Sequence, residues 1–305
     1  MRNRIYAVLG VVLLLAAAGI LCGTLLGPYA LVTSVQGALT EAQVAQLARV
    51  KDIYHFAFAP PHKQASSAAT YIPRYQTAAR AEADTYASLF GIAGEPAETD
   101  EAFVYTGESG ELTVQKYSGG VSYRAAPYCS DWFSREAAVA GIGENNFADS
   151  REAGPPAEPN AAIGKDGAVS AAEAFLRRHG LNAPYNHAVA YSNGSVYTVL
   201  FISKLGGIDN YAFPAAVLVD SRGAVLAAEM FAFAYDRLAS CRVKPVMEAC
   251  AALPVDMAGG TRVTLGKCTF TYVFANSILQ PAYLLEGETA DGAAFRCFVN
   301  AAAYP

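Results

Sequence analysis

Charged residues are scarce in this chain, and no stretch concentrates one sign of charge. Asp, Glu, Lys and Arg together make up 16% of the 305 residues, and the formal net charge is -5. A protein that binds nucleic acid carries a basic surface that neutralises phosphates. Because this chain has no such surplus, we predict that nucleic acid is not a partner.

Sequence motifs of the common catalytic and metal sites are also missing. The chain contains no C-x-x-C, H-E-x-x-H, G-x-S-x-G or S-x-x-K pattern and no glycine-rich phosphate loop. We therefore predict no catalytic residue, no metal site and no cofactor, so that the protein is not an enzyme. Tyr and Phe are plentiful, with 18 and 15 copies, but they fall mostly in phase with the faces of expected strands. This phase favours core packing over a platform that binds sugars or peptides.

The N-terminus holds the one long apolar run. From Ile5 to Leu26 there is no charged side chain, and a helix of this length crosses the roughly 30 Å hydrocarbon core of a bilayer. Residues 1–27 are therefore predicted to be an uncleaved transmembrane anchor. Arg2 and Arg4 should stay in the cytoplasm, so that the later domains lie outside a cell membrane crossed once. A cleaved signal peptide is the alternative, although its apolar region is normally about 7–15 residues long.

Small residues gather in the second half of this apolar run. Gly19 and Gly23 are four positions apart on one face of a helix, and Ala16 precedes them on the same side. Small residues let membrane helices approach each other closely. We therefore predict that Ala16, Gly19 and Gly23 contact another membrane helix. The alternative is that small residues are simply common in membrane spans.

An odd number of cysteines follows the anchor, and an odd number cannot all pair within one exported chain. Three of them recur in phase with apolar neighbours, which predicts small buried core residues: Cys250, Cys268 and Cys297. Bridges from Cys241 to Cys250, or from Cys268 to Cys297, stay open as alternatives.

Helix and strand signals follow one another along the rest of the chain in the order helix, then strands, three times over. This order predicts the α+β class, with helices packed on one face of antiparallel sheets. Residues 28–152 are expected to form an extracytoplasmic α+β domain, and the Pro- and Gly-rich stretch 153–167 a linker. Residues 168–305 are expected to form a second domain of two helix-plus-sheet modules, 168–242 and 243–305.

Local patterns predict the bounds of several helices. Apolar residues at spacings of three or four predict a helix from Pro73 to about Phe90. Ser170 and Glu173 have the spacing of a capping box, which predicts that another helix starts there. Residues 51–70 are rich in Pro, Ser and Ala and are expected to be an irregular loop.

Turn residues predict hairpins in the C-terminal part. Asn193-Gly194 between two alternating runs is a strong hairpin signal, and 221–223 repeats the pattern. Glu286, Glu288 and Asp291 lie between two later strand-like runs. A calcium loop needs more oxygen ligands at regular spacing, so these acids are predicted to be a solvated turn.

An envelope-associated hydrolase, or a ligand-binding protein with a site assembled from distant residues, is the alternative function. His55 would be the base of such a hydrolase and Cys129, beside Trp132, its nucleophile. The fold would have to bring an imidazole close to that thiol.

Three stretches resemble the YycH/YycI group of membrane-anchored regulatory proteins of Gram-positive bacteria. They are the arginine-flanked anchor, the helix SAAEAFLRRHGL with the later VKPVMEACAALP, and the ending LQPAYLLEGETADGAAFRCFVNA. The likeness covers Ala168 to Ala301 best, and small modules of the PepSY kind have a similar build. It consists of packing and turn signatures, without catalytic residues.

This resemblance implies a function without catalysis. Members of the group sit beside a sensor histidine kinase of a two-component system and tune it through membrane and extracytoplasmic contacts. The expected partners are therefore such a kinase, a paralogous anchored regulator, and the membrane itself.

Overall fold

A computed structural model describes residues 41–59, 66–126, 150–151, 163–181, 185–193, 196–231, 233–253, 261–275, 277–292 and 294–303. The predicted anchor with Ala16, Gly19 and Gly23 lies outside the described residues, and so does Cys129. Within these ranges, no helix has the length and apolar character needed to cross a membrane.

Four helices and sixteen strands are described. The helices are α3 (Glu41–Ile53), α4 (Arg80–Leu89), α6 (Gly164–Arg178) and α7 (Val246–Cys250). The strands are β1 (Tyr54–Phe56), β2 (Ser67–Arg74), β3 (Ala97–Glu98), β4 (Ala102–Gly107), β5 (Gly110–Gln115), β6 (Val121–Ala125), β7 (Ser150–Arg151), β8 (His187–Asn193), β9 (Val196–Leu205), β10 (Ile208–Asp220), β11 (Val225–Met230), β12 (Ala234–Val243), β13 (Val263–Ala275), β14 (Ile278–Thr289), β15 (Ala294–Asn300) and β16 (Ala302–Ala303).

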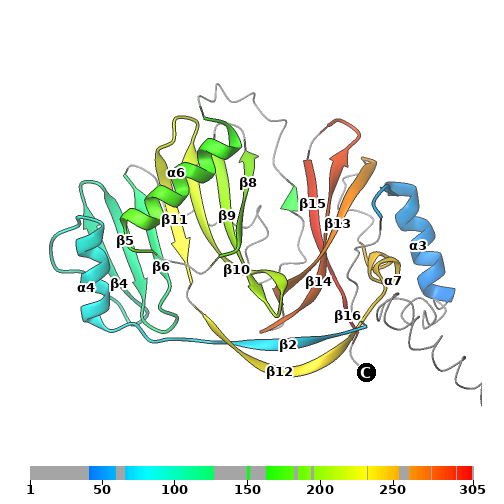
Figure 1. The fold of residues 1–305 in the computed structure, drawn as a ribbon, viewed down its shortest axis with the longest axis horizontal. Coiled ribbons are helices and arrows are strands. Elements are labelled where there is room, and N and C mark those ends of the chain that lie inside the picture. Colours follow the sequence, from blue (N-terminus) through cyan, green and yellow to red (C-terminus); the bar gives the residue numbers. More distant parts are fainter. Residues whose placement is uncertain are drawn as a thin grey trace, which may run out of the picture.

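Helices α4 and α6 cover one face of the strands β3–β6 and β8–β11, which we call the first half-sheet (Figure 1). Ala87 of α4 and Leu176 of α6 are buried in one core with Leu112, Val199 and Val217 of the strands. These strand residues follow the period of two that turns alternate side chains to the same face. The apolar stripe of each helix thus closes one side of the half-sheet.

Helices α3 and α7 cover the strands β1 and β13–β15, which we call the second half-sheet (Figure 1). Val50 of α3 and Val246 of α7 are buried with Leu265, Leu285 and Val299. The arrangement repeats that of the first half-sheet. It agrees with the expectation that helices pack on one face of each sheet.

A third core fills the space between the two half-sheets. It includes Leu200 and Leu218 from the first half-sheet and Val273, Leu284 and Phe298 from the second. Each half-sheet therefore has apolar side chains on both faces. The described residues form four layers in the order helices, sheet, sheet, helices.

One strand pairing joins the half-sheets into a single hydrogen-bonded network. At its start, β10 pairs in parallel with β13, Asp209 with Thr271 and Asn210 with Tyr272. Strands β2 and β12 form a long antiparallel ribbon that runs along the same side of both halves (Figure 1). We call the region around the start of β10 the seam.

The α+β class is confirmed, but the sheet is mixed because β1 and β10 both run parallel to β13. The helix predicted from Pro73 is wrong at its start. That stretch continues strand β2, and α4 begins only at Arg80. Proline is tolerated in β2 because this strand pairs with β14 only at Tyr71 and so has an almost open second edge. The loop expected over 51–70 also contains β1 and the start of β2.

Helix α6 begins earlier than the capping pattern predicts. It starts at Gly164 and takes in the end of the stretch that composition assigns to a linker. Ser170 is not its cap, since the Ser170 hydroxyl donates to the Asp166 carbonyl oxygen one turn before it (3.0 Å). Side-chain bonding of this kind is common for serine inside helices.

Both predicted hairpins are confirmed. Strands β8 and β9 pair up to Asn193 and Val196, on either side of the predicted turn. Strands β10 and β11 are joined by a turn in which Gly223 has a φ of 92°. There the Asp220 carboxylate accepts from the Arg222 and Ala224 backbone N–H groups, both at 2.8 Å. The turn chemistry thus needs glycine for its backbone and aspartate for its hydrogen bonds.

Candidate binding pocket at the seam

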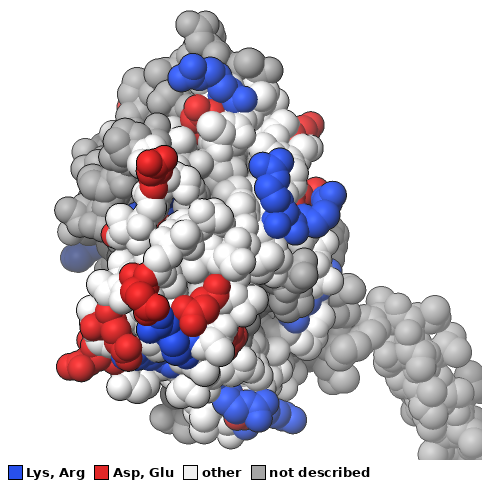
Figure 2. Space-filling model, turned by 90° about the vertical axis from the view of Figure 1, so that its left-hand side faces the viewer, with Lys and Arg blue, Asp and Glu red and all other residues white. Residues whose placement is uncertain are grey.

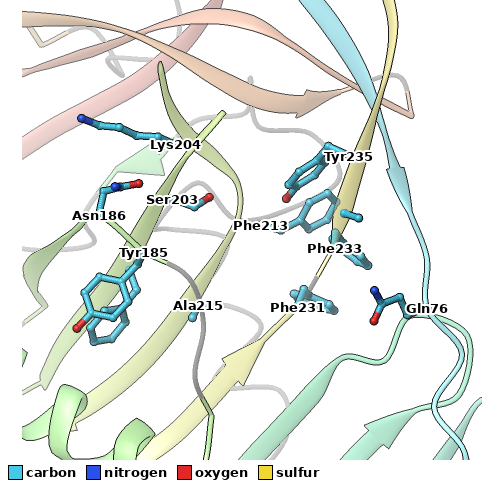
Figure 3. A pocket seen from close by; sticks show the side chains of 12 residues that line it. Gln76, Tyr185, Asn186, Ser203, Lys204, Phe213, Ala215, Phe231, Phe233 and Tyr235 are labelled. Carbon is cyan, nitrogen blue, oxygen red and sulfur yellow. The ribbon is translucent and has the colours of Figure 1, made fainter. Parts of the chain in front are cut away.

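A pocket of about 510 Å³ lies beside the seam, between the first half-sheet and the start of β12 (Figure 3). Twelve residues line it, from four separate parts of the chain. They come from the loop after β2, from the residues just before β8, from β9 and β10, and from the β11–β12 connection with the start of β12. A cavity of this size is typical of ligand sites.

An interruption in β10 creates one wall of the pocket. Asn210 pairs with Ser203 of β9, and the next pair is Ala215 with Phe201, so that 211–214 bulge out of the ladder. On its other edge β10 pairs with β13 before the bulge and with β11 after it. Before the bulge, the Thr271 hydroxyl of β13 donates to the Asp209 carbonyl oxygen (2.7 Å). Bulges redirect side chains at such places. Here the bulge turns Phe213 into the pocket.

Aromatic rings form one end of the pocket. Phe213 lies edge-on to Phe233, with ring centroids 4.6 Å apart, and Phe231 and Phe233 are stacked at 5.5 Å. Phe213 also contacts Phe274 of β13 at 4.8 Å. The Phe231 ring rests against Gly120, where an added Cβ would lie 2.7 Å from the ring. Pairs of this geometry contribute about 0.5–1.5 kcal/mol each beyond their burial, so the aromatic end is held in place before any ligand arrives.

Hydrogen-bonding groups lie around the rings. Figure 3 shows Asn186 and Ser203 on one side of them and Gln76 on the other, with Tyr235 next to Phe213. Burial raises the pKa of Tyr235, while a hydrogen bond with the Asn210 side chain lowers it. Tyr235 is therefore a neutral donor and acceptor at neutral pH. These groups bind polar atoms without carrying charge.

Lys204 is the one charged residue among the twelve described residues that line the pocket. Figure 3 shows its ammonium group pointing away from the rings. Alternation explains this direction, because Lys204 pairs with Asp209 and shares its face of β9 with Ile202 of the core between the half-sheets. The inner wall is therefore neutral.

Tyr185 stands at the mouth of the pocket. Its ring contacts Phe201 edge-on at 4.7 Å, and its hydroxyl donates to Glu173 of α6 (3.0 Å). Burial and this hydrogen bond raise the pKa of Tyr185. The side chain is 39% exposed, so it is accessible from outside while α6 fixes its position.

The histidine proposed as a catalytic base lies elsewhere. His55 is exposed on β1, in the second half-sheet, opposite Thr264. A different imidazole, that of His187, lies 3.7 Å from the carboxylate of Asp209. Both residues share a face with Ile202, whereas Ser203 of the pocket points to the opposite face. The pocket thus does not combine this pair with the Ser203 hydroxyl.

The three acids near the C-terminus are largely part of a strand. Glu286 and Glu288 belong to β14, and Glu286 forms an ion pair with Lys267 of β13 (2.6 Å). Asp291 is in the turn, where it accepts from the Thr289 hydroxyl. In the described part of the chain, no group of three or more His, Cys, Asp or Glu residues is placed to hold a metal ion.

The cysteines agree with the core prediction in two of three cases. Cys250 and Cys297 are buried, while Cys268 is partly buried. Cys241, Cys250 and Cys268 are free thiols in the described residues, so neither alternative bridge is present. Burial raises the pKa values of Cys250 and Cys268 to about 12. A thiol in this state is a poor nucleophile.

The charged groups at the other end of the first half-sheet form surface networks. Figure 2 shows acidic side chains gathered around basic ones over the end of the molecule that carries α4. Arg80 binds both Asp84 (2.9 Å) and Glu95, and the Tyr105 hydroxyl donates to Asp84 (2.5 Å). The bonds from Tyr105 and Arg80 lower the pKa of Asp84. Asp84 and Glu95 each have a basic or hydroxyl partner, which indicates a structural role.

No family model matches the chain, and no curated protein matches it either. One solved structure that resembles it is the Bacillus megaterium YpeB C-terminal domain, with 12% sequence identity and a TM-score of 0.38. The match covers 75% of this chain and 95% of that domain. At this TM-score the likeness assigns neither a function nor a site.

The pocket was not predicted from the sequence because the aromatic residues were attributed to core packing. Phe231, Phe233 and Tyr235 alternate in FAFAY and read as one face of a strand. In the fold, Phe231 and Phe233 lie between β11 and β12, outside both strands. The nearest signal was Pro214 after Phe213, since proline within a strand pattern indicates a bulge.

Proposed function

We propose that this protein is a non-enzymatic, membrane-anchored extracytoplasmic regulator that binds a sensor histidine kinase and tunes its activity. The observation that carries the proposal is the seam pocket with its aromatic rings and neutral hydrogen-bonding groups. Such a lining is suited to holding a ligand or a partner group by apolar burial and hydrogen bonds. It presents no charged group to the rings.

The pocket supports binding better than it supports hydrolysis. A hydrolase needs a nucleophile and a base within hydrogen-bonding reach of each other, opening onto the site. Ser203 faces the pocket, while the pair of His187 and Asp209 lies on the other face of β9. The envelope-associated hydrolase therefore stays the second candidate, with Cys129 as its test residue.

The kinase as partner, and the cell membrane as location, rest on the resemblance of the sequence to the YycH/YycI group. In that proposal the helix formed by residues 1–27 anchors the chain beside the kinase. Ala16, Gly19 and Gly23 contact a transmembrane helix of the kinase or of a paralogous regulator. The four layers outside the membrane present the pocket to the extracytoplasmic part of the partner.

The test is photocrosslinking of the full-length protein in the cells that produce it. A photoreactive phenylalanine analogue replaces Tyr185, which is 39% exposed at the pocket mouth, or Val44, which is 53% exposed on α3. We expect the Tyr185 position to capture a sensor histidine kinase, identified by mass spectrometry. The same capture should be lost when Phe213→Ala is added.

Each outcome has a separate meaning. Capture of the kinase from Val44 alone would keep the kinase as partner and remove the pocket as its contact. Capture of no histidine kinase from either position would contradict the proposed function. Hydrolysis that is abolished by Cys129→Ala would favour the second candidate.

A further inference from the structure

We infer that the seam pocket binds an extended polypeptide segment of the partner and takes up one of its large apolar side chains. The inference rests on the proposed function and specifies what the partner presents to this site. It follows from the order of groups in Figure 3, where the rings of Phe213, Phe231 and Phe233 lie between Asn186 on one side and Gln76 on the other.

The rings define the position of an apolar side chain. Phe213 and Phe233 meet edge-on, and both line the cavity. Phe213 is only partly buried although it lies in the middle of the sheet network. A Phe or Leu side chain placed here would remove this surface from water, and that burial drives binding.

The flanking groups match a peptide backbone. Gln76 and Asn186 each offer an amide that donates and accepts, and Ser203 and Tyr235 offer hydroxyls. A chain that crosses the pocket with its side chain between the rings has peptide groups on both sides of that side chain. An alkyl chain would instead cover Gln76, Asn186 and Ser203 without giving them partners, which is unfavourable.

Charge does not contribute to recognition of the segment. The inner wall is neutral, and Lys204 lies beyond Asn186 with its ammonium group outside the rings (Figure 3). Because Lys204 lies on the face of β9 opposite Ser203, this ammonium group is not part of the surface that the apolar residue contacts. The expected segment therefore has one large apolar residue, and its recognition requires no charge.

The pocket needs little rearrangement to bind. The β10 bulge, the contact of Phe231 with Gly120 and the bond between Tyr185 and Glu173 each fix one wall. A site whose groups are already ordered loses less entropy on binding. Short peptides therefore suffice as probes.

The experiment uses the full-length protein in lipid nanodiscs and three dye-labelled hexapeptides, GSFSEG, GSLSEG and GSASEG. Fluorescence anisotropy measures their affinities. We expect the Phe and Leu peptides to bind about ten- to a hundredfold more tightly than the Ala peptide, as burial of one large apolar side chain implies. Phe213→Ala should remove this preference. Phe58→Ala, which truncates a partly buried phenylalanine in the other outer layer, should keep it.

A second pocket variant covers the case in which Phe213→Ala does not fold. Ser203 is only partly buried, and Ser203→Leu fills the pocket while leaving the rings in place. Equal affinity for all three peptides, or unchanged binding by Ser203→Leu, would overturn the inference. Octanoate that binds where no peptide does would also overturn it and assign the pocket to acyl chains. If the pocket selects the Phe and Leu peptides but no kinase is captured, this inference holds and the kinase is rejected as partner. If the kinase is captured but the peptides bind equally, the kinase is kept as partner and this inference is rejected.

Discussion

Leu284 and Leu285 are neighbours on β14, but their side chains lie in different cores. Truncating each to alanine should therefore destabilise a different pair of layers. Leu284 is buried in the core between the half-sheets, and Leu285 is buried against α3 and α7. Both are almost fully inaccessible, at 1% and 0%. Leu→Ala at such sites destabilises proteins by about 3 kcal/mol, within a range of roughly 2–5. The two variants should therefore lose similar stability in urea unfolding.

Hydrogen exchange measured by mass spectrometry should separate the two variants. Leu284→Ala should speed exchange in β9 and β10, which contribute Leu200 and Leu218 to the same core. Leu285→Ala should instead speed exchange in α7, through Val246. A destabilisation of about 3 kcal/mol raises the rate of amide exchange roughly a hundredfold where exchange requires the structure to open. Unchanged exchange in 196–220 for Leu284→Ala, with faster exchange in α7, would refute the four-layer arrangement.

Three further outcomes test the pocket and the buried ionisable groups. Gly120→Ala should displace the Phe231 ring, because the added Cβ would lie 2.7 Å from it. We expect a lower melting temperature and weaker binding of the peptide GSFSEG to the pocket. Cys250 and Cys268 have pKa values raised by burial from 9.0 to about 12, so their contribution to stability is full below pH 9 and is lost toward pH 12. Urea unfolding at pH 8 and pH 10.5 measures the resulting fall in the free energy of unfolding. Cys250→Ala should make this fall smaller. Burial raises the pKa of Glu229 above 4.5, so stability should fall as the pH rises through the raised value; Glu229→Gln should abolish that fall, which melting curves at pH 4.5 and pH 8 would detect.

Local signals predicted the parts of the fold that depend on neighbours in sequence. The hairpin at Asn193 and the turn at Gly223 follow from turn chemistry, and the burial of Cys250 and Cys297 follows from their phase. The error at Pro73 has a different cause, since the pairing of β2 with the distant β12 overrides a helical spacing of apolar residues. Long-range pairing of this kind leaves no local signature.

The site was the least predictable part because it arises where distant strands meet. Strand β10 pairs with β9 before and after the bulge at 211–214, while its other edge pairs with β13 before the bulge and with β11 after it. The bulge removes Phe213 from the ladder. The ring is then covered only in part, by Phe231 and Phe233 from the β11–β12 connection. The same strand therefore both joins the half-sheets and builds the wall of the pocket. A ligand that binds this wall would stabilise the folded arrangement that contains the bulge, because binding to one arrangement shifts the population toward it.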